Sequence, residues 1–202
     1  SSRYADFKAR VQNISAQVSY NTGTQNVNYD RGNKYDFRTM DASIEYEQKF
    51  GRLSVKPGFA YRSAVYDDTP YSDLVLKTGI FNARGEISSR AASLRSEYAL
   101  FDEKLRLVAG ASANTFNYPD KTYAAYQFAG TFKPNKKHLF RAVFSKAPRS
   151  SNVFDTYVNQ TIAYYPVGPR NFVTTVLAGN KNIELLTSEM LEVGYRSSLS
   201  YK

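Results

Sequence analysis

The strongest constraint on the fold of this chain is a two-residue alternation of apolar and polar side chains that returns along almost its whole length. Segment 37–50 shows it clearly, with apolar Met40, Ala42, Ile44, Tyr46 and Phe50 set against polar Asp41, Ser43, Glu45, Glu47 and Lys49. Successive side chains of a β-strand point to opposite faces. The pattern therefore predicts strands with one apolar and one polar face.

The alternation stops and restarts several times, and each restart follows residues that are typical of turns or loops. We therefore predict an all-β chain of about eight strands. They are expected at residues 4–20, 37–50, 53–62, 88–101, 105–116, 122–132, 138–146 and 188–201.

The predicted connections alternate between short and long. Tight turns are expected at 51–52, 102–104 and 133–137, each directly after a phenylalanine, namely Phe50, Phe101 or Phe132. The other connections are expected at 21–34, 67–87, 117–121 and 148–187, and only the third of these is short. Strict alternation predicts an antiparallel up-and-down meander with short turns at one end and loops at the other.

This asymmetry is typical of outer-membrane β-barrels, which have short periplasmic turns, long extracellular loops and aromatic girdles at both interfaces. The phenylalanine before each tight turn occupies the position of a periplasmic girdle residue. The alternative is a soluble β-meander whose apolar face packs against a partner outside this sequence. We favour the barrel because loop lengths, girdle positions and alternation all agree with it.

The segment 183–201 has two interpretations. Ile183, Leu186 and Met190 lie at helical spacing, whereas from Leu191 onward the two-residue period persists to Tyr201. The persistence favours a strand that follows the end of a loop. Its lipid-facing residues are expected to be Leu191, Val193, Tyr195, Leu199 and Tyr201, and its lumen-facing residues to include Glu192, Gly194 and Arg196.

The polar faces carry charges that can pair across predicted hairpins. A hairpin that turns at Gly51 brings Glu45 or Glu47 opposite Lys56, and Asp41 near Arg62; the next tight turn brings Glu97 near Arg106. Such charges suit a wet or plugged lumen, since they are costly in hydrocarbon. The predicted lumen-facing charges are Asp41, Glu45, Glu47, Lys56, Arg62, Glu97, Arg106, Glu192 and Arg196.

Composition narrows the function classes. The net charge is +9, but the basic residues are scattered among acids, so we expect no nucleic-acid partner. No run approaches the roughly 20 apolar residues of a membrane helix. There is no Cys and one His, and no nucleotide-binding, zinc-protease or nucleophile-elbow motif occurs. We therefore expect no enzyme, no metal site and no cofactor.

Two stretches, 139-LFRAVFSKAPRSSNVFDTYV-158 and 179-GNKNIELLTSEMLEVGYRSSL-199, together resemble the late barrel of TonB-dependent outer-membrane receptors, most closely those of the Bacteroidota type. In that family an alternating strand leads into a long extracellular loop, which ends in Asn-Pro-Asn-Leu-Lys-Pro-Glu before the next strand. Asn182 stands at the last Asn of this motif and Ile183 at its Leu, while Leu186 and Thr187 replace its Pro-Glu end. The following strand pattern continues through Glu189, Glu192, Gly194, Tyr195 and Arg196.

The resemblance implies that residues 1–202 are part of one outer-membrane barrel domain of 22 strands, with the plug domain and the C-terminal strands outside this sequence. It implies a bacterial receptor that imports a glycan, siderophore or peptide. Implied partners are outer-membrane lipid, the plug domain of the same protein, the TonB–ExbB–ExbD complex and a surface lipoprotein lid. The resemblance implies no cofactor.

Ligand contact is expected in the longest predicted loop, because aromatic and Arg side chains in extracellular loops suit recognition of small ligands. The candidate residues are Tyr164, Tyr165, Arg170 and Phe172. The alternative is that they pack the loop against its neighbours. Three other functions stay open: a self-contained structural or adhesin-like barrel, an outer-membrane hydrolase, and a soluble basic protein that binds polyanions.

Overall fold

The computed structural model describes residues 1–28, 33–75, 77–149, 151–169 and 172–198. Most of the chain forms one antiparallel sheet, and the remainder adds a hairpin and one short helix. The sheet contains β1 (Ser2–Val11), β2 (Ile14–Asn28), β3 (Asn33–Tyr46), β4 (Gln48–Phe50), β5 (Leu53–Asp67), β6 (Arg84–Leu100), β7 (Leu105–Asn117), β8 (Asp120–Asn135), β9 (His138–Pro148) and β12 (Thr187–Ser197). The other elements are α1 (Val153–Tyr157), β10 (Asn159–Pro166) and β11 (Phe172–Ala178).

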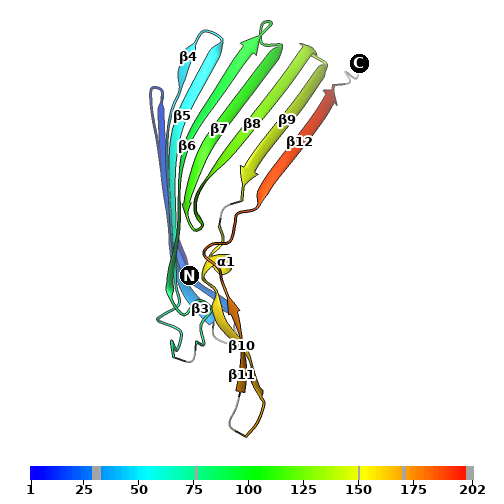
Figure 1. Ribbon diagram of the computed structural model, residues 1–202. Coiled ribbons are helices and arrows are strands. Elements are labelled where there is room, and N and C mark those ends of the chain that lie inside the picture. Colours follow the sequence, from blue (N-terminus) through cyan, green and yellow to red (C-terminus); the bar gives the residue numbers. More distant parts are fainter. Residues whose placement is uncertain (29–32, 76, 150, 170–171, 199–202) are drawn as a thin grey trace.

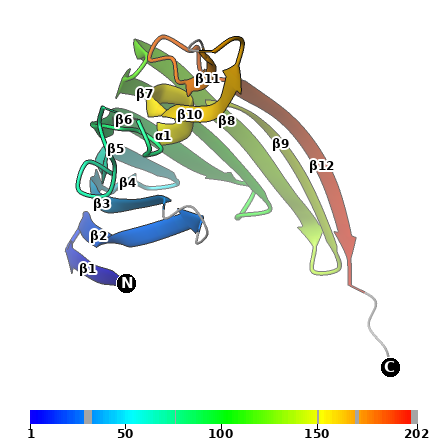
Figure 2. The same ribbon diagram turned by 90° about the horizontal axis from the view of Figure 1, so that it is seen from below.

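The large sheet is an up-and-down meander. Its strand order is β1-β2-β3-β5-β6-β7-β8-β9-β12, and β4 pairs with β5. Short turns gather at one end, while the longer connections and the β10–β11 hairpin lie at the other (Figure 1). The sheet is curved like part of a cylinder wall (Figure 2). Among the described residues, no helix is long and apolar enough to cross a membrane.

The cross-strand register places most of the large apolar side chains of neighbouring strands on one face. One row across the sheet runs Leu191, Phe144, Phe128, Ala109, Ser96 and Val55, and the adjacent row runs Glu192, Val143, Ala129, Val108, Glu97 and Ser54. The apolar face is open to its surroundings, with Val193 80% exposed and Phe7 67% exposed. The fold is therefore the two-faced antiparallel meander that the alternation predicts.

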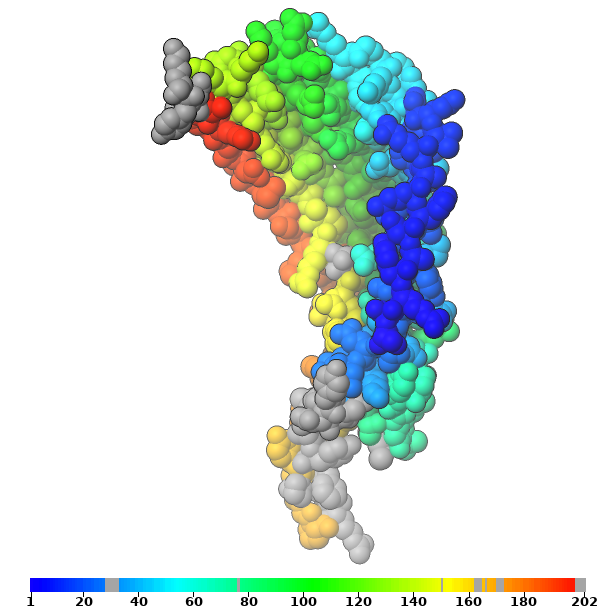
Figure 3. Space-filling view, turned by 180° about the vertical axis from the view of Figure 1, so that it is seen from behind, coloured from blue at the N-terminus to red at the C-terminus, as the bar shows by residue number. Residues whose placement is uncertain are grey.

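The buried core lies on the charged face, at the long-loop end. Tyr35, Ile80, Phe81, Val153 and Val158 are buried together there. Tyr35 shares its face with Asp41, since both are odd-numbered positions of β3. Figure 2 shows α1, which carries Val153, inside the curve of the sheet. The charged face therefore lines the concave side, which Figure 3 shows from behind as a hollow between β1 and β12.

The N-terminal part differs from the prediction of one strand over 4–20. It forms β1 and β2, joined by a tight turn at Gln12 and Asn13, where Gln12 has a φ of +50°. The sequence does carry a signal for this turn, because the apolar positions change from odd numbers, as in Val11, to even numbers, as in Ile14. The predicted 21–34 loop is also wrong, since strand structure extends to Asn28 and resumes at Asn33.

Two further differences from the prediction concern the end of β3 and residues 148–187. β3 ends at Tyr46 because its partner position in β5 is Pro57, which has no N–H to donate to the ladder. Residues 148–187, predicted as one loop, contain α1 and the β10–β11 hairpin. Strand β12 begins at Thr187, so the strand interpretation of the C-terminal segment is confirmed, while Leu199 and Tyr201 lie outside the described residues.

Asp68 anchors the connection between β5 and β6. Its side chain is fully buried, and its carboxylate accepts hydrogen bonds from three backbone amides: Phe81 at 2.7 Å, Asn82 at 3.1 Å and Ala83 at 3.1 Å. A carboxylate that binds several backbone N–H groups takes the place of a missing strand partner. This contact holds Ile80 and Phe81 in the core.

Replacement of Asp68 by Ala is expected to open the 79–83 segment. The three amide donors lose their acceptor, at a cost of about 2–3 kcal/mol in local stability. Hydrogen exchange at the amides of Phe81, Asn82 and Ala83 measures the effect. Asp102→Ala is the matched control, because the Asp102 side chain is 93% exposed. Equal protection of the three amides in wild type and Asp68→Ala would contradict this role.

Candidate functional site: a capped pocket on the concave face

The long-loop end of the sheet carries a cap built from two distant connections, residues 68–83 and 152–186. Asn82 joins them, since its side-chain amide donates to the Asn159 carbonyl at 2.6 Å. The Asn159 amide in turn donates to the Ile80 carbonyl at 2.9 Å. The aromatic cluster beneath adds Phe81 against Phe154, with ring centroids 5.4 Å apart. We call the described residues of these two connections, 68–75, 77–83, 152–169 and 172–186, the loop cap.

Helix α1 places the centre of the loop cap. It begins after Asn152, whose side-chain oxygen accepts a hydrogen bond from the Phe154 amide at 2.9 Å, as is typical of an N-cap residue. The Thr156 hydroxyl donates to the Asn152 carbonyl at 2.9 Å. Val153 and Thr156 are the buried residues of the helix, and Val153 belongs to the core against the sheet. The helix ends at Tyr157, because Val158 is extended.

A pocket of about 280 Å³ lies between the loop cap and the concave face of the sheet. Arg62 from β5 and Arg149 just after β9 contribute its two cationic side chains. The remaining lining residues are uncharged and include three serines: Ala64, Tyr66, Ile87, Ser88, Ser89, Phe116, Ser151, Asn152 and Val153. Guanidinium groups with neighbouring hydroxyls suit a carboxylate or phosphate group, which they can bind through paired hydrogen bonds.

The two arginines differ in how far their charges are compensated. Arg62 Nε lies 3.4 Å from the Asp41 carboxylate, so part of its charge is already paired. Arg149 has no carboxylate partner within the described residues, and its backbone amide donates to the Leu186 carbonyl at 2.7 Å. The Ser151 hydroxyl oxygen is buried and has no hydrogen-bond partner among the described residues. Arg149 and Ser151 therefore have capacity for a ligand.

The other charges predicted to face the lumen lie on the concave face, where several pair across strands. The described ion pairs of these residues are Lys56–Glu47 at 3.3 Å, Arg10–Glu47 at 3.9 Å, Arg106–Glu97 at 3.2 Å, Arg95–Glu97 at 3.9 Å and Arg141–Glu192 at 3.8 Å. Glu45 and Arg196 form no ion pair within the described part of the chain. All these side chains are partly exposed, so each pair contributes little to stability, of the order of 0–1 kcal/mol.

Two lysine side chains, Lys181 and Lys121, make the contacts that fix the segment leading into β12. Lys181 Nζ lies 5.0 Å from the ring centroids of both Tyr118 and Tyr157. Burial raises the pKa of the Tyr157 phenol, whose hydroxyl donates to the Glu86 carbonyl at 2.9 Å. Closer to β12, Lys121 Nζ donates to Glu184.

The hydrogen bond from Lys121 lowers the pKa of the Glu184 carboxyl, so Glu184 stays charged at neutral pH. The loop cap is therefore attached to the start of β8 as well as to β5 and β6.

The ligand residues predicted from the sequence belong to the β10–β11 hairpin, outside the Arg62–Arg149 pocket. Tyr164 pairs with Thr174 in the backbone register, and Tyr165, which is 58% exposed, pairs with Val173. Phe172 begins β11, and Arg170 lies outside the described residues. The hairpin projects beyond the end of the sheet (Figure 1).

The sequence analysis does not select Arg149 as a site residue, although its position at the end of a strand could have indicated it. Arg149 follows directly on the last residue of β9, where the concave wall meets the loop cap. Arg62 was assigned to the polar face, but the β5–β6 connection and α1 that cover it could not be placed from periodicity. Long-range loop packing decides which charged residues line the pocket.

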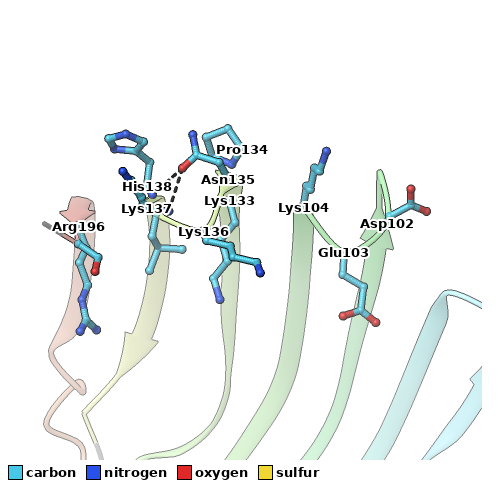
Figure 4. A pocket seen from close by; sticks show the side chains of 12 residues that line it. Asp102, Glu103, Lys104, Lys133, Pro134, Asn135, Lys136, Lys137, His138 and Arg196 are labelled. Atoms are coloured by element: carbon cyan, nitrogen blue, oxygen red, sulfur yellow. Dashed lines mark hydrogen bonds between the residues drawn. The ribbon is translucent and has the colours of Figure 1, made fainter. Parts of the chain in front are cut away.

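A second pocket, of about 580 Å³, lies at the short-turn rim between the β6–β7 and β8–β9 turns (Figure 4). Its charged lining has five basic side chains and two carboxylates: Lys104, Lys133, Lys136, Lys137, Arg196, Asp102 and Glu103. The Asn135 side-chain oxygen fixes the β8–β9 turn by accepting hydrogen bonds from the amides of Lys137 and His138, at 2.9 and 3.1 Å. The short-turn rim is strongly basic here.

The sequence matches no protein-family model, and no curated protein matches it. Solved structures do match. The crystal structure of the siderophore receptor PirA from Acinetobacter baumannii superposes with a TM-score of 0.64 at 11% sequence identity. The match covers 98% of this chain and 32% of that one, so the chain spans about a third of the receptor's length. The chain therefore has the fold of a segment of an outer-membrane receptor barrel.

Proposed function

We propose that this chain is part of the wall of a TonB-dependent outer-membrane receptor that imports a small ligand. One observation carries the proposal. Apolar side chains cover most of the convex side from β1 to β12, while the opposite face carries charges that pair across strands, and the two longest connections lie at the same end of the sheet. A lipid-facing wall around a polar lumen needs this arrangement. The fold shared with a siderophore receptor supports it.

In this proposal the whole protein works by binding and passage, without catalysis. The charged concave wall contacts a plug domain of the same protein, and the TonB–ExbB–ExbD complex supplies the energy that opens a path. A surface lipoprotein lid would meet the loop cap, including its β10–β11 hairpin. The outer membrane is the proposed location.

The Arg62–Arg149 pocket favours ligands that carry an anionic group. Arg149 has no ion-pair partner in the described segments, and serine hydroxyls surround the same space. A siderophore or peptide with a carboxylate fits this chemistry better than an uncharged glycan. Tyr165 and its neighbours on the β10–β11 hairpin stay candidates for the first contact with the ligand.

A self-contained small barrel is the less favoured alternative. It would require β1 to pair with β12 so that no strand edge stays open. In the described sheet β1 pairs only with β2, and β12 pairs only with β9. The sheet is an open arc (Figure 2). This geometry favours a wall segment of a larger barrel.

Substitutions at two neighbouring positions of β12 distinguish the hypothesis of a lipid-facing wall from that of a soluble sheet. Val193→Arg is expected to prevent stable insertion, since an arginine at the lipid face costs about 2–4 kcal/mol near the bilayer midplane. Gly194→Arg is the matched control, because a side chain at Gly194 meets nothing within 4 Å and points to the polar face. Recovery of folded protein from the outer-membrane fraction measures both.

A soluble sheet predicts a different outcome. Val193 is 80% exposed, so an arginine there would be harmless in water. Equal recovery of the Val193→Arg and Gly194→Arg variants would contradict the membrane assignment.

Replacement of Arg149 by Gln is expected to weaken ligand binding without loss of the fold. Removal of one charge-assisted contact should reduce affinity by about tenfold. Binding of carboxylate-bearing siderophores, carboxylate-bearing peptides and neutral glycans to the whole receptor, followed by fluorescence quenching, measures it. Arg84→Gln is the control, since Arg84 is an exposed arginine at the same end, at the start of β6, and does not line the pocket. Preferential binding of neutral glycans, unaffected by Arg149→Gln, would overturn the anionic assignment.

A further inference from the structure

The convex face has a shallow groove where small residues interrupt its bulky side chains. The groove has a volume of about 500 Å³, and almost all of its surface is apolar. Ala109, Gly130 and Ala142 form its floor on β7, β8 and β9. Its walls are larger side chains: Tyr98, Leu107, Phe128, Phe144 and Leu191. We call this feature the convex groove.

An aromatic row closes the convex groove on the side of the short turns. Phe132, Phe140 and Tyr195 are cross-strand neighbours, next along the apolar face after Gly130 and Ala142. The ring centroids of Phe132 and Phe140 are 6.4 Å apart, and those of Phe140 and Tyr195 are 4.9 Å apart. Aromatic rows of this kind lie at the level of lipid headgroups in membrane barrels.

Polar groups begin at once beyond the aromatic row. The Tyr195 hydroxyl hydrogen-bonds His138 Nδ1 at 2.7 Å, so the wet end of the tyrosine points toward the β8–β9 turn. Lys136 and Lys137 lie in that turn. The Asn135 side chain fixes the backbone of the turn by accepting hydrogen bonds from the amides of Lys137 and His138 (Figure 4). Neither lysine has an ion-pair partner among the residues that the structure describes. The turn thus presents uncompensated positive charge beside an apolar surface.

We propose that the convex groove and the β8–β9 turn together bind one phospholipid with an anionic headgroup, from the leaflet on the short-turn side. An acyl chain lies over Gly130 and Ala142, and the headgroup phosphate meets Lys136, Lys137 and His138. Lys137 precedes Ala142 by five positions. Five strand residues span about 16 Å, which is about the thickness of the hydrocarbon in one leaflet, so an acyl chain whose headgroup meets Lys137 reaches Ala142.

Charge complementarity selects this occupant. A neutral apolar partner would fill the convex groove but would leave the lysines unused, whereas an anionic lipid uses both. Each lysine near an anionic lipid surface changes affinity by about fivefold. This inference rests on the proposed location of the chain in the outer membrane.

The test is lipid retention by the whole natural protein, purified in detergent, stripped of lipid and examined by native mass spectrometry. Phosphatidylglycerol and zwitterionic phosphatidylcholine are added separately. We expect one tightly retained phosphatidylglycerol, and a loss of affinity of about tenfold or more in Lys136→Gln/Lys137→Gln. Lys49→Gln/Arg52→Gln removes the same charge from another turn of the same rim and should retain the lipid.

A second variant tests the convex groove independently of charge. Ala142→Phe fills the floor between Phe140 and Phe144 and should reduce retention of both lipids while the lysines stay intact. Equal affinity for the two lipids in the wild type, or an unchanged affinity in both test variants, would overturn the inference. Failure of the protein to fractionate with the outer membrane would instead overturn the proposed function, so the two failures are distinguishable.

Discussion

The antiparallel cross-strand register is the constraint on which the rest of this structure depends. Because each strand pairs with its neighbour without a one-residue slip through most of the sheet, most large apolar side chains stay on one face from β1 to β12, opposite the paired charges such as Glu97 and Arg106. A slip of one residue would move charges such as Glu97 onto the apolar face. The concave pocket, the convex groove and both rims are consequences of this register.

The sequence predicts the faces of the sheet well because a strand's periodicity is local. The alternation through Glu192 and Val193 assigned β12 to its two faces, and cross-strand pairing of Asp41 with Arg62 followed from the position of one turn. The turn at Gln12 was missed, because it contains no glycine or proline and is marked only by a change of parity.

The candidate site was much less predictable. Asp68 is one of many loop carboxylates in the sequence, and only the folded loop shows that it holds Phe81 and its neighbours. Helix α1 is five residues long, too short for a periodic signal. Arg149 and Arg62 are far apart in the chain and meet only because the sheet curves and the loop cap covers it. Contacts between loops depend on shape, which periodicity does not encode.

The central claim is that the convex face of this sheet faces lipid. Spin labels placed singly at each position from 189 to 196 of β12, in the whole protein in bilayers, test it most directly. The account predicts that accessibility to oxygen peaks at Leu191, Val193 and Tyr195, and that accessibility to a water-soluble nickel complex peaks at Glu192 and Gly194. High nickel accessibility at all eight positions, without a two-residue period, would contradict it.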